Sequence, residues 1–224
     1  DVAGSRFTDA AGNNNTAATQ FTWTYDGTAP TISSTAPAQD ANIKDTEVSY
    51  TLSETVASGT VTFTQTGGSA DGSSPHEQDL SGAELNTGAH NTITLTDNPT
   101  LEDGAIYSIA FDATDAAGNA ATRVTNTGIT YDVTAPTMVI TAAEGADGLT
   151  SNDATLALTF TSSEATDDFA VGDITVDNGA LSDFVEASST VYTATFTPTA
   201  DGAATIDVAG SRFTDAAGNN NTAA

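Results

Sequence analysis

The sequence is punctuated by the stretch Tyr-Asp-Val-Thr-Ala-Pro-Thr at residues 131–137 and by its near copy Tyr-Asp-Gly-Thr-Ala-Pro-Thr at residues 25–31. Each copy follows the phrase Thr-Asp-Ala-Ala-Gly-Asn, which begins at Thr8 and Thr114 and occurs a third time from Thr214. The same number of residues separates the two phrases in both cases. This fixed order indicates that one module ends and the next begins at each Tyr-Asp-x-Thr-Ala-Pro-Thr.

A longer repeat encloses these junctions. Residues 1–18 recur without change at residues 207–224, and two unlike modules lie between the copies. We therefore expect three parts. Residues 1–28 are the C-terminal piece of a preceding module, residues 29–132 are a complete module, and residues 133–224 are a module that lacks its last strand.

Short runs with a period of two residues make up both modules, and Gly, Asp, Asn and Pro separate them. The runs are residues 31–33, 48–53, 60–65, 91–96, 105–112 and 124–131 in the first module, and 138–140, 154–161, 173–176, 191–196 and 203–208 in the second. No segment longer than a turn has a helical period. This pattern predicts an all-β fold of tandem immunoglobulin-like β-sandwich modules in an extended array.

The charge is strongly one-sided, with 30 Asp and Glu against 4 Lys and Arg and a net charge of −26. Nothing here could neutralise phosphates, which argues against nucleic acid as a partner, and no apolar run is long enough for membrane insertion. A divalent cation is the natural counter-charge, and a solvated acidic coat is the alternative. The chain has no Cys, so metal is the expected substitute for disulfides.

The acidic residues also recur at fixed points of the repeat. In a β-sandwich of this kind, the start of the first strand and the loops after the second and sixth strands lie at one end. This geometry should bring together Asp132, Glu164 and Asp215 in the second module. The corresponding residues of the first module are Asp26, Glu54 and Asp115, with Asp112 nearby.

Three carboxylates repel one another at such a point unless a cation compensates them. Ca²⁺ binds six to eight oxygens, whereas Mg²⁺ prefers a rigid octahedron and Zn²⁺ prefers Cys and His. The Pro of each junction shortens and stiffens the linker. We therefore expect Ca²⁺ to lock neighbouring repeats of the same chain into a rod. Asp45, Asp103, Asp153 and Asp201 lie in loops at the opposite pole, where turn formation is their better interpretation.

The two junction phrases, taken with Ser53-Glu54 and Ser163-Glu164, resemble the bacterial Ig-like repeats of giant surface adhesins exported by type I secretion. The resemblance covers nearly the whole chain. It implies a secreted, extracellular protein at the bacterial cell surface, with a stalk of many tandem modules and calcium at the linkers. A structural extender of a cell-surface adhesin is the function that it suggests, with roles in cell adhesion and biofilm.

Two other functions stay open. Residues 67–88 form a long polar excursion that could bind glycan or ice. The broken modules at both ends could instead exchange strands head to tail with other copies, as in a self-assembling filament or biofilm-matrix subunit.

An enzyme is not expected, because the sequence has neither a nucleophile elbow nor a phosphate-binding loop. His76 and His90 read as solvated surface residues, and Phe21, Trp23 and Tyr25 read as the core face of a final strand.

Overall fold

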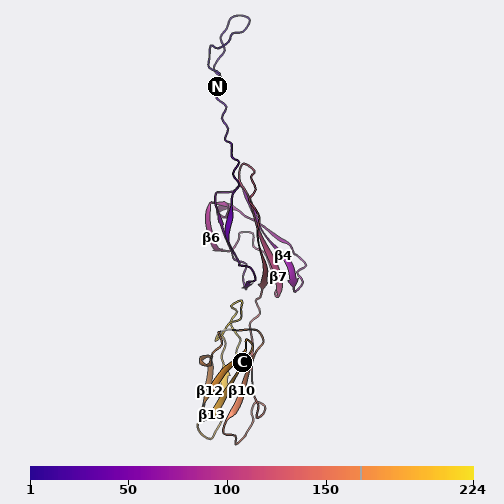
Figure 1. The fold of residues 1–224 in the computed structure, drawn as a ribbon, viewed down its shortest axis with the longest axis vertical. Coiled ribbons are helices and arrows are strands. Elements are labelled where there is room, and N and C mark those ends of the chain that lie inside the picture. Colours follow the sequence, from indigo (N-terminus) through magenta and orange to yellow (C-terminus); the bar gives the residue numbers. More distant parts are fainter. Residues whose placement is uncertain (167) are drawn as a thin grey trace.

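The computed structural model describes residues 1–166 and 168–224, which form three parts along one long axis (Figure 1). Residues 1–29 precede the first sheet, strands β1 to β8 form module one, and strands β9 to β14 form module two. The described residues contain only two short 3-10 helices, η1 (Gly82–Leu85) and η2 (Val171–Asp173). The prediction of an all-β fold with tandem sandwiches is confirmed.

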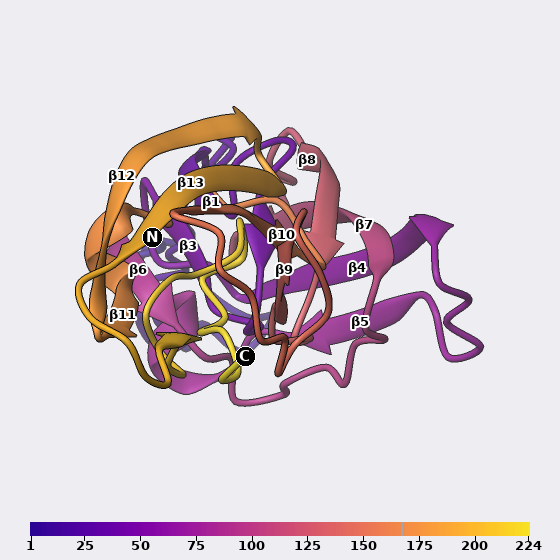
Figure 2. The same cartoon turned by 90° about the horizontal axis from the view of Figure 1, so that it is seen from below.

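Module one packs a three-stranded sheet against a five-stranded one. The smaller sheet has the order β1 (Ile32–Ala36), β3 (Val48–Leu52), β6 (Gly88–Ile93). The larger has the order β2 (Asn42–Ile43), β8 (Val124–Tyr131), β7 (Ala105–Thr114), β4 (Ser58–Gly68), β5 (His76–Asp79). All these pairs are antiparallel except β2 with β8. The hairpin of β4 and β5 projects sideways from the long axis (Figure 2).

The core of module one follows from strict alternation along its central strands. Every second residue of β7 is buried, including Tyr107, Ile109 and Phe111. Val61 and Phe63 of β4 are fully buried in the same cluster. A period of two puts these side chains on one face, so the sheet gains its stability by covering that face with the smaller sheet.

Module two is built from a four-stranded sheet and a two-stranded one. The order of the first is β12 (Gly179–Ser188), β13 (Val191–Pro198), β10 (Leu156–Ser162), β9 (Met138–Ala142). The second pairs β11 (Ile174–Asp177) with β14 (Thr205–Val208). Its core contains Phe160, Phe169, Tyr192 and Phe213, with Phe169 in edge contact with the last two.

The duplicated segments, residues 1–18 and 207–224, have the same local structure. The Asn15 side-chain oxygen accepts hydrogen bonds from the backbone N–H groups of Arg6 and Phe7, and the Asn221 oxygen accepts the equivalent pair. We call residues 1–18 the N-terminal hairpin. Its fold is therefore encoded locally, because it forms the same bonds although no module body surrounds it (Figure 1).

Three strands were not predicted, namely β2, β5 and β12, and β6 begins at Gly88 rather than at residue 91. β5 lies inside the polar excursion of residues 67–88, which is therefore partly sheet. The expectation for His76 was wrong. Its side chain is only 10% exposed, and its ring nitrogen lies 2.6 Å from the Asp71 carboxylate, which also accepts a hydrogen bond from Tyr107.

The expected core strand near the N-terminus is also absent. Phe21, Trp23 and Tyr25 are 86%, 73% and 79% exposed, because residues 19–26 run as a single extended segment between the N-terminal hairpin and module one. His90 lies on β6, where its ring stacks on Tyr50 with centroids 4.7 Å apart.

Candidate metal centre

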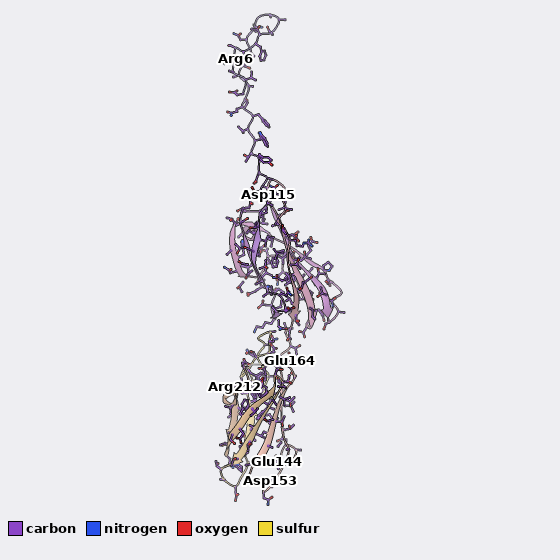
Figure 3. The ribbon with its side chains drawn as sticks, in the orientation of Figure 1. Arg6, Asp115, Glu144, Asp153, Glu164 and Arg212 are labelled. Atoms are coloured by element: carbon purple, nitrogen blue, oxygen red, sulfur yellow. The ribbon has the colours of Figure 1, made fainter. Side chains whose placement is uncertain are left out.

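Two groups of three carboxylates meet as the sequence predicted. Asp26, Glu54 and Asp115 form the first trio; a ligand oxygen from each lies within 4.8 Å of the others. Asp132, Glu164 and Asp215 form the second trio under the same limit. Figure 3 shows Asp115 at the end of module one that receives the N-terminal segment and Glu164 at the end of module two that faces module one. Each trio therefore lies where a linker enters a module.

The turn that follows β7 explains the position of Asp115. Its Oδ1 accepts hydrogen bonds from the backbone N–H groups of Ala117 and Asn119, which close a tight turn. Gly118 has a φ of +91°, a conformation that suits glycine. Asp215 makes the same bonds to Ala217 and Asn219. The phrase Thr-Asp-Ala-Ala-Gly-Asn is thus a turn that points its carboxylate back toward the linker.

The Ser-Glu phrase also contributes to each site in two ways: the Ser bonds to the linker, and the Glu belongs to the trio. Ser163 and Thr137 exchange two bonds, because the Ser163 Oγ accepts from the Thr137 N–H while the Ser163 N–H donates to the Thr137 carbonyl. Ser53 and Thr31 repeat this arrangement. The serine fixes the residue that follows each junction Pro, and the next residue along the chain is the Glu of the trio.

Asn219 ties the linker to the turn. Its Nδ2 donates to the backbone carbonyl of Asp132 at 2.9 Å and to the Asp215 carboxylate at 3.0 Å. In module one, Asn119 donates to the Asp26 carbonyl at 3.2 Å and to Asp115 at 2.8 Å. The amide nitrogen makes both bonds, so this Asn holds the turn against the linker.

The carboxylates of the second trio repel one another. Burial raises the pKa of Glu164, and the negative charges of Asp132 and Asp215 raise it further. In module one the Asn119 side chain, with backbone donors of the same turn, holds the pKa of Asp115 below its usual value although burial opposes this. Asp115 and Asp215 are 4% and 6% exposed, so each trio includes one buried carboxylate.

This donor set fits a hard divalent cation. All ligand atoms of both trios are carboxylate oxygens, which Ca²⁺ and Mg²⁺ favour and which Zn²⁺ sites rarely use alone. A cation between the carboxylates would remove the repulsion that raises the pKa of Glu164.

Module one adds direct contacts at the second junction. The Asp103 carboxylate accepts hydrogen bonds from the Val133 N–H at 2.9 Å and the Thr134 hydroxyl at 2.7 Å. Lys44 donates from its ammonium group to the carbonyl of Gly218. The second junction is therefore held by module one as well as by Asn219 of module two, and Asp132 is partly buried whereas Asp26 is exposed.

Asp112 is the one predicted ligand that lies outside both trios. Its carboxylate pairs with Arg123 at 2.8 Å and 2.9 Å. Asp112 belongs to β7, where its side chain shares the outer face with Ser108 and Ala110, whereas Asp115 lies beyond the strand end. Sequence reasoning also missed Asp168 of module two, which is not in a trio but holds the start of the turn, because its carboxylate accepts hydrogen bonds from the Thr214 N–H and hydroxyl.

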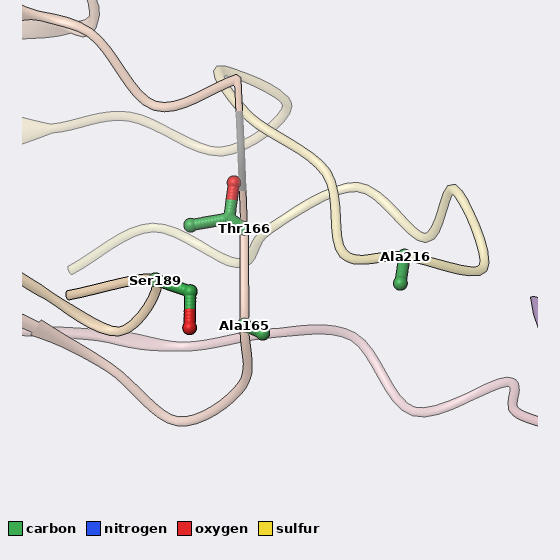
Figure 4. Close-up of a pocket in the computed structure, with 4 residues that line it drawn as sticks. All are labelled: Ala165, Thr166, Ser189 and Ala216. Atoms are coloured by element: carbon green, nitrogen blue, oxygen red, sulfur yellow. The ribbon is translucent and has the colours of Figure 1, made fainter.

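A shallow hollow adjoins the second trio, lined by Ala165, Thr166, Ser189 and Ala216 (Figure 4). These side chains are small and none of them is ionisable, so the hollow offers no acid–base group. Among the described residues, no helix has the length and apolar character needed to cross a bilayer.

The fold and the sites define a class of protein: tandem β-sandwich modules with an acidic trio at each linker. A family profile described as bacterial Ig-like domain matches residues 26–131, and a second profile with the same description matches residues 132–224. No curated protein matches the sequence. Residues 26–224 are therefore two tandem bacterial Ig-like domains, a type of domain that is typically extracellular and generally serves as a non-enzymatic structural module.

Proposed function

We propose that this chain is an extender segment of a bacterial cell-surface adhesin, and that Ca²⁺ bound by the acidic trios stiffens its inter-module linkers. The observation that carries the proposal is the composition of each trio. One carboxylate comes from the linker, Asp26 or Asp132, and two come from the module that follows it. A cation at this point would bind the linker to the module body.

The mechanical consequence follows from what the linker is already bound to. Asn219 and Asp103 fix the backbone around Asp132 from opposite sides, one from module two and one from module one. A bound Ca²⁺ would add its ligand bonds to this set and neutralise the charge that opposes the compact arrangement. With the ion the modules would form a rod, and without it they would turn more freely about each linker.

Thermal unfolding with Ca²⁺ and with a chelator, combined with small-angle X-ray scattering, tests the proposal. A cation at about 100 times its Kd adds roughly 2.7 kcal/mol, which raises the Tm of a domain of this size by roughly 10–20 °C. The maximum dimension should be sharply defined with Ca²⁺ and broadly distributed in chelator.

The test variant is Asp132→Asn. Its matched control is Asp153→Asn, and Mg²⁺ at the same concentration is the control for the cation. Asp132→Asn should abolish the effect at the second junction, whereas Asp153 lies at the far pole of module two (Figure 3) and its variant should behave as the unmodified chain. Equal Tm values and equal scattering curves with Ca²⁺ and chelator would show that the carboxylates are a solvated acidic coat.

A further inference from the structure

Module one meets module two through a small surface at the end that faces the second junction (Figure 1). We call Ile43, Lys44 and Asp103 the docking pole. Ile43 ends β2, the two-residue strand that pairs in parallel with the last residues of β8, and Lys44 follows it directly. Asp103 lies in the turn before β7. Two segments that are distant in the sequence therefore form one surface.

The docking pole binds three successive residues of the linker. The Ile43 carbonyl accepts a hydrogen bond from the Asp132 N–H at 2.8 Å. The Asp103 carboxylate accepts from the Thr134 hydroxyl and the Val133 N–H, and these bonds hold its pKa below the usual value. The direction in which the linker leaves module one is therefore set by module one itself.

A further contact crosses from module one to the body of module two. Lys44 is the only Lys of the chain, and its ammonium group donates to the Gly218 carbonyl. A Cβ built on Gly218 would lie 3.4 Å from the Lys44 Nζ, so the turn and the ammonium group approach each other closely. The bonds to the linker fix its direction, whereas this bond also fixes the rotation of module two about the linker.

The linker that the docking pole binds has a counterpart before module one. Asp26 corresponds to Asp132 and Thr28 to Thr134. In both linkers the Thr N–H donates to the Asp carboxylate at 3.0 Å. The docking pole touches the linker through backbone N–H groups and one Thr hydroxyl. The residue between the Asp and the Thr is therefore free to differ, as it does in the two linkers.

The turn that receives Lys44 also has a counterpart in module one. Gly118 corresponds to Gly218, and their φ angles are +91° and +83°. Asn119 ties this turn to the Asp26 carbonyl in the same way as at the second junction. Linker and turn are thus held together alike in both modules, so each module presents the same groups to a preceding docking pole.

We propose that the docking pole is a surface that binds the linker and turn of a following module without a metal ion, and that it accepts a module of either type. All the groups that it contacts are present at both junctions. Each such module end also carries an acidic trio, so the ammonium group of Lys44 meets a surface of opposite charge.

Distance measurements between two spin labels in chelator test this proposal. The chain has no Cys, so the labels go only to Thr64→Cys on β4 and Thr161→Cys on β10, which are both exposed. We expect one narrow distance peak. The double variant Lys44→Met/Asp103→Ala keeps the net charge and should lose this peak while it keeps the Tm of both modules. A narrow peak in the double variant, or a broad distribution in the labelled chain without it, would overturn the proposal.

Asp45→Ala is the matched control for charge. Asp45 adjoins Lys44 in the sequence, and its carboxylate accepts a hydrogen bond from the Glu47 N–H of the same module. This variant should keep the narrow peak, whereas Asp103→Ala, which removes the same charge, should lose it. Equal loss of the peak in both variants would assign the effect to the charge of this end of module one and would overturn the role of the Asp103 bonds.

A longer chain tests whether the docking pole accepts either type of module. It carries a second copy of residues 26–131 directly after the first, so that the docking pole of the first copy faces an identical module. Labels at Thr64→Cys of the first copy and Thr125→Cys of the second should again give a narrow peak in chelator. The double variant should remove this peak when it is placed in the first copy and leave it when it is placed in the second. A broad distribution at this new junction would overturn the acceptance of either module. All these measurements are made in chelator, so they are independent of calcium binding.

Discussion

Phe7 and Phe213 occupy the same position in two identical segments, yet Phe7 is 63% exposed and Phe213 is 1% exposed. Both have the same local hydrogen bonds, since the Asn15 and Asn221 oxygens hold their backbone N–H groups. The difference comes from the module body, where Phe213 contacts Phe169 with ring centroids 5.2 Å apart. Local sequence therefore sets the shape of this segment, and tertiary packing sets its stability.

This pair of residues gives a matched test of packing. Phe213→Ala should lower the free energy of unfolding of module two by about 3–5 kcal/mol, because it removes a buried ring and leaves a cavity. Phe7→Ala, the same change in the same local sequence, should leave both unfolding transitions in place. Urea titration followed by far-UV circular dichroism measures the unfolding of both variants. A comparable loss in the two variants would mean that the N-terminal hairpin is packed in solution.

Asp215→Asn should remove the effect of Ca²⁺ on module two. Asn keeps an oxygen that can accept the bonds from Ala217 and Asn219, but it loses the charge that a cation would require. We expect the Ca²⁺-dependent rise in Tm to vanish for module two and to persist for module one. Asp9→Asn changes the identical turn in the N-terminal hairpin and serves as the control. A full Ca²⁺ response in the Asp215 variant would remove this residue from the ligand set.

The raised pKa of Glu164 predicts an unusual pH dependence of the stability of module two in chelator. Its pKa in the folded protein is raised above the usual 4.5, so the folded state binds more protons than the unfolded state in the window just above that value. The stability of module two should therefore fall as the pH rises through this window. With Ca²⁺ the trend should reverse, because protons then compete with the cation for the same oxygens.

Glu164→Gln should flatten both trends, which separates Glu164 from the other carboxylates. Unfolding of the two proteins between about pH 4.5 and pH 7, with and without chelator, measures this. An unchanged slope in the Gln variant would assign the titration to another group. Below this range Asp115 and Asp168 also protonate. Their pKa values are lowered in the folded protein, so the stability falls as the pH falls.

Asn219→Ala should loosen the second junction with little effect on the module core. The variant lacks the amide that bridges the Asp132 carbonyl and the Asp215 carboxylate. We expect a loss of about 1 kcal/mol for each removed bond and a broader distance distribution in small-angle scattering. Asn13→Ala is the control, because Asn13 bonds to Asp9 in the N-terminal hairpin, which has no module below it. Identical scattering from both variants would mean that Asp103 and Lys44, rather than Asn219, hold the second junction.

The strands that sequence reasoning found are those with a buried face. β7 alternates along its whole length, and its bounds were predicted closely. β5 reads His-Glu-Gln-Asp and has no apolar residue, and β12 is mostly exposed. Hydrophobic periodicity carries no signal for such strands, because backbone pairing rather than burial holds them in the sheet. The two-residue β2 is too short to have any period.

The trios were predictable because turn chemistry and repeat spacing both fix them. The position of Asp112, outside both trios, shows the limit of that reasoning. Only two residues lie between Asp112 and Asp115 in sequence, but alternation along β7 turns the Asp112 carboxylate outward to Arg123. The exposure of Trp23 was not predictable either, because the pattern of a strand says which face is apolar and does not say what covers it.

The unlike topologies of the two modules have a consequence for how an array of them folds. Module one divides its strands three and five, and module two divides them four and two. Adjacent domains with matching sequences are prone to misassembly as they emerge, since each can capture an element of its neighbour. Here, module one separates the identical residues 1–18 and 207–224, and its strand order differs from that of module two, so the neighbouring domain offers no matching element to exchange.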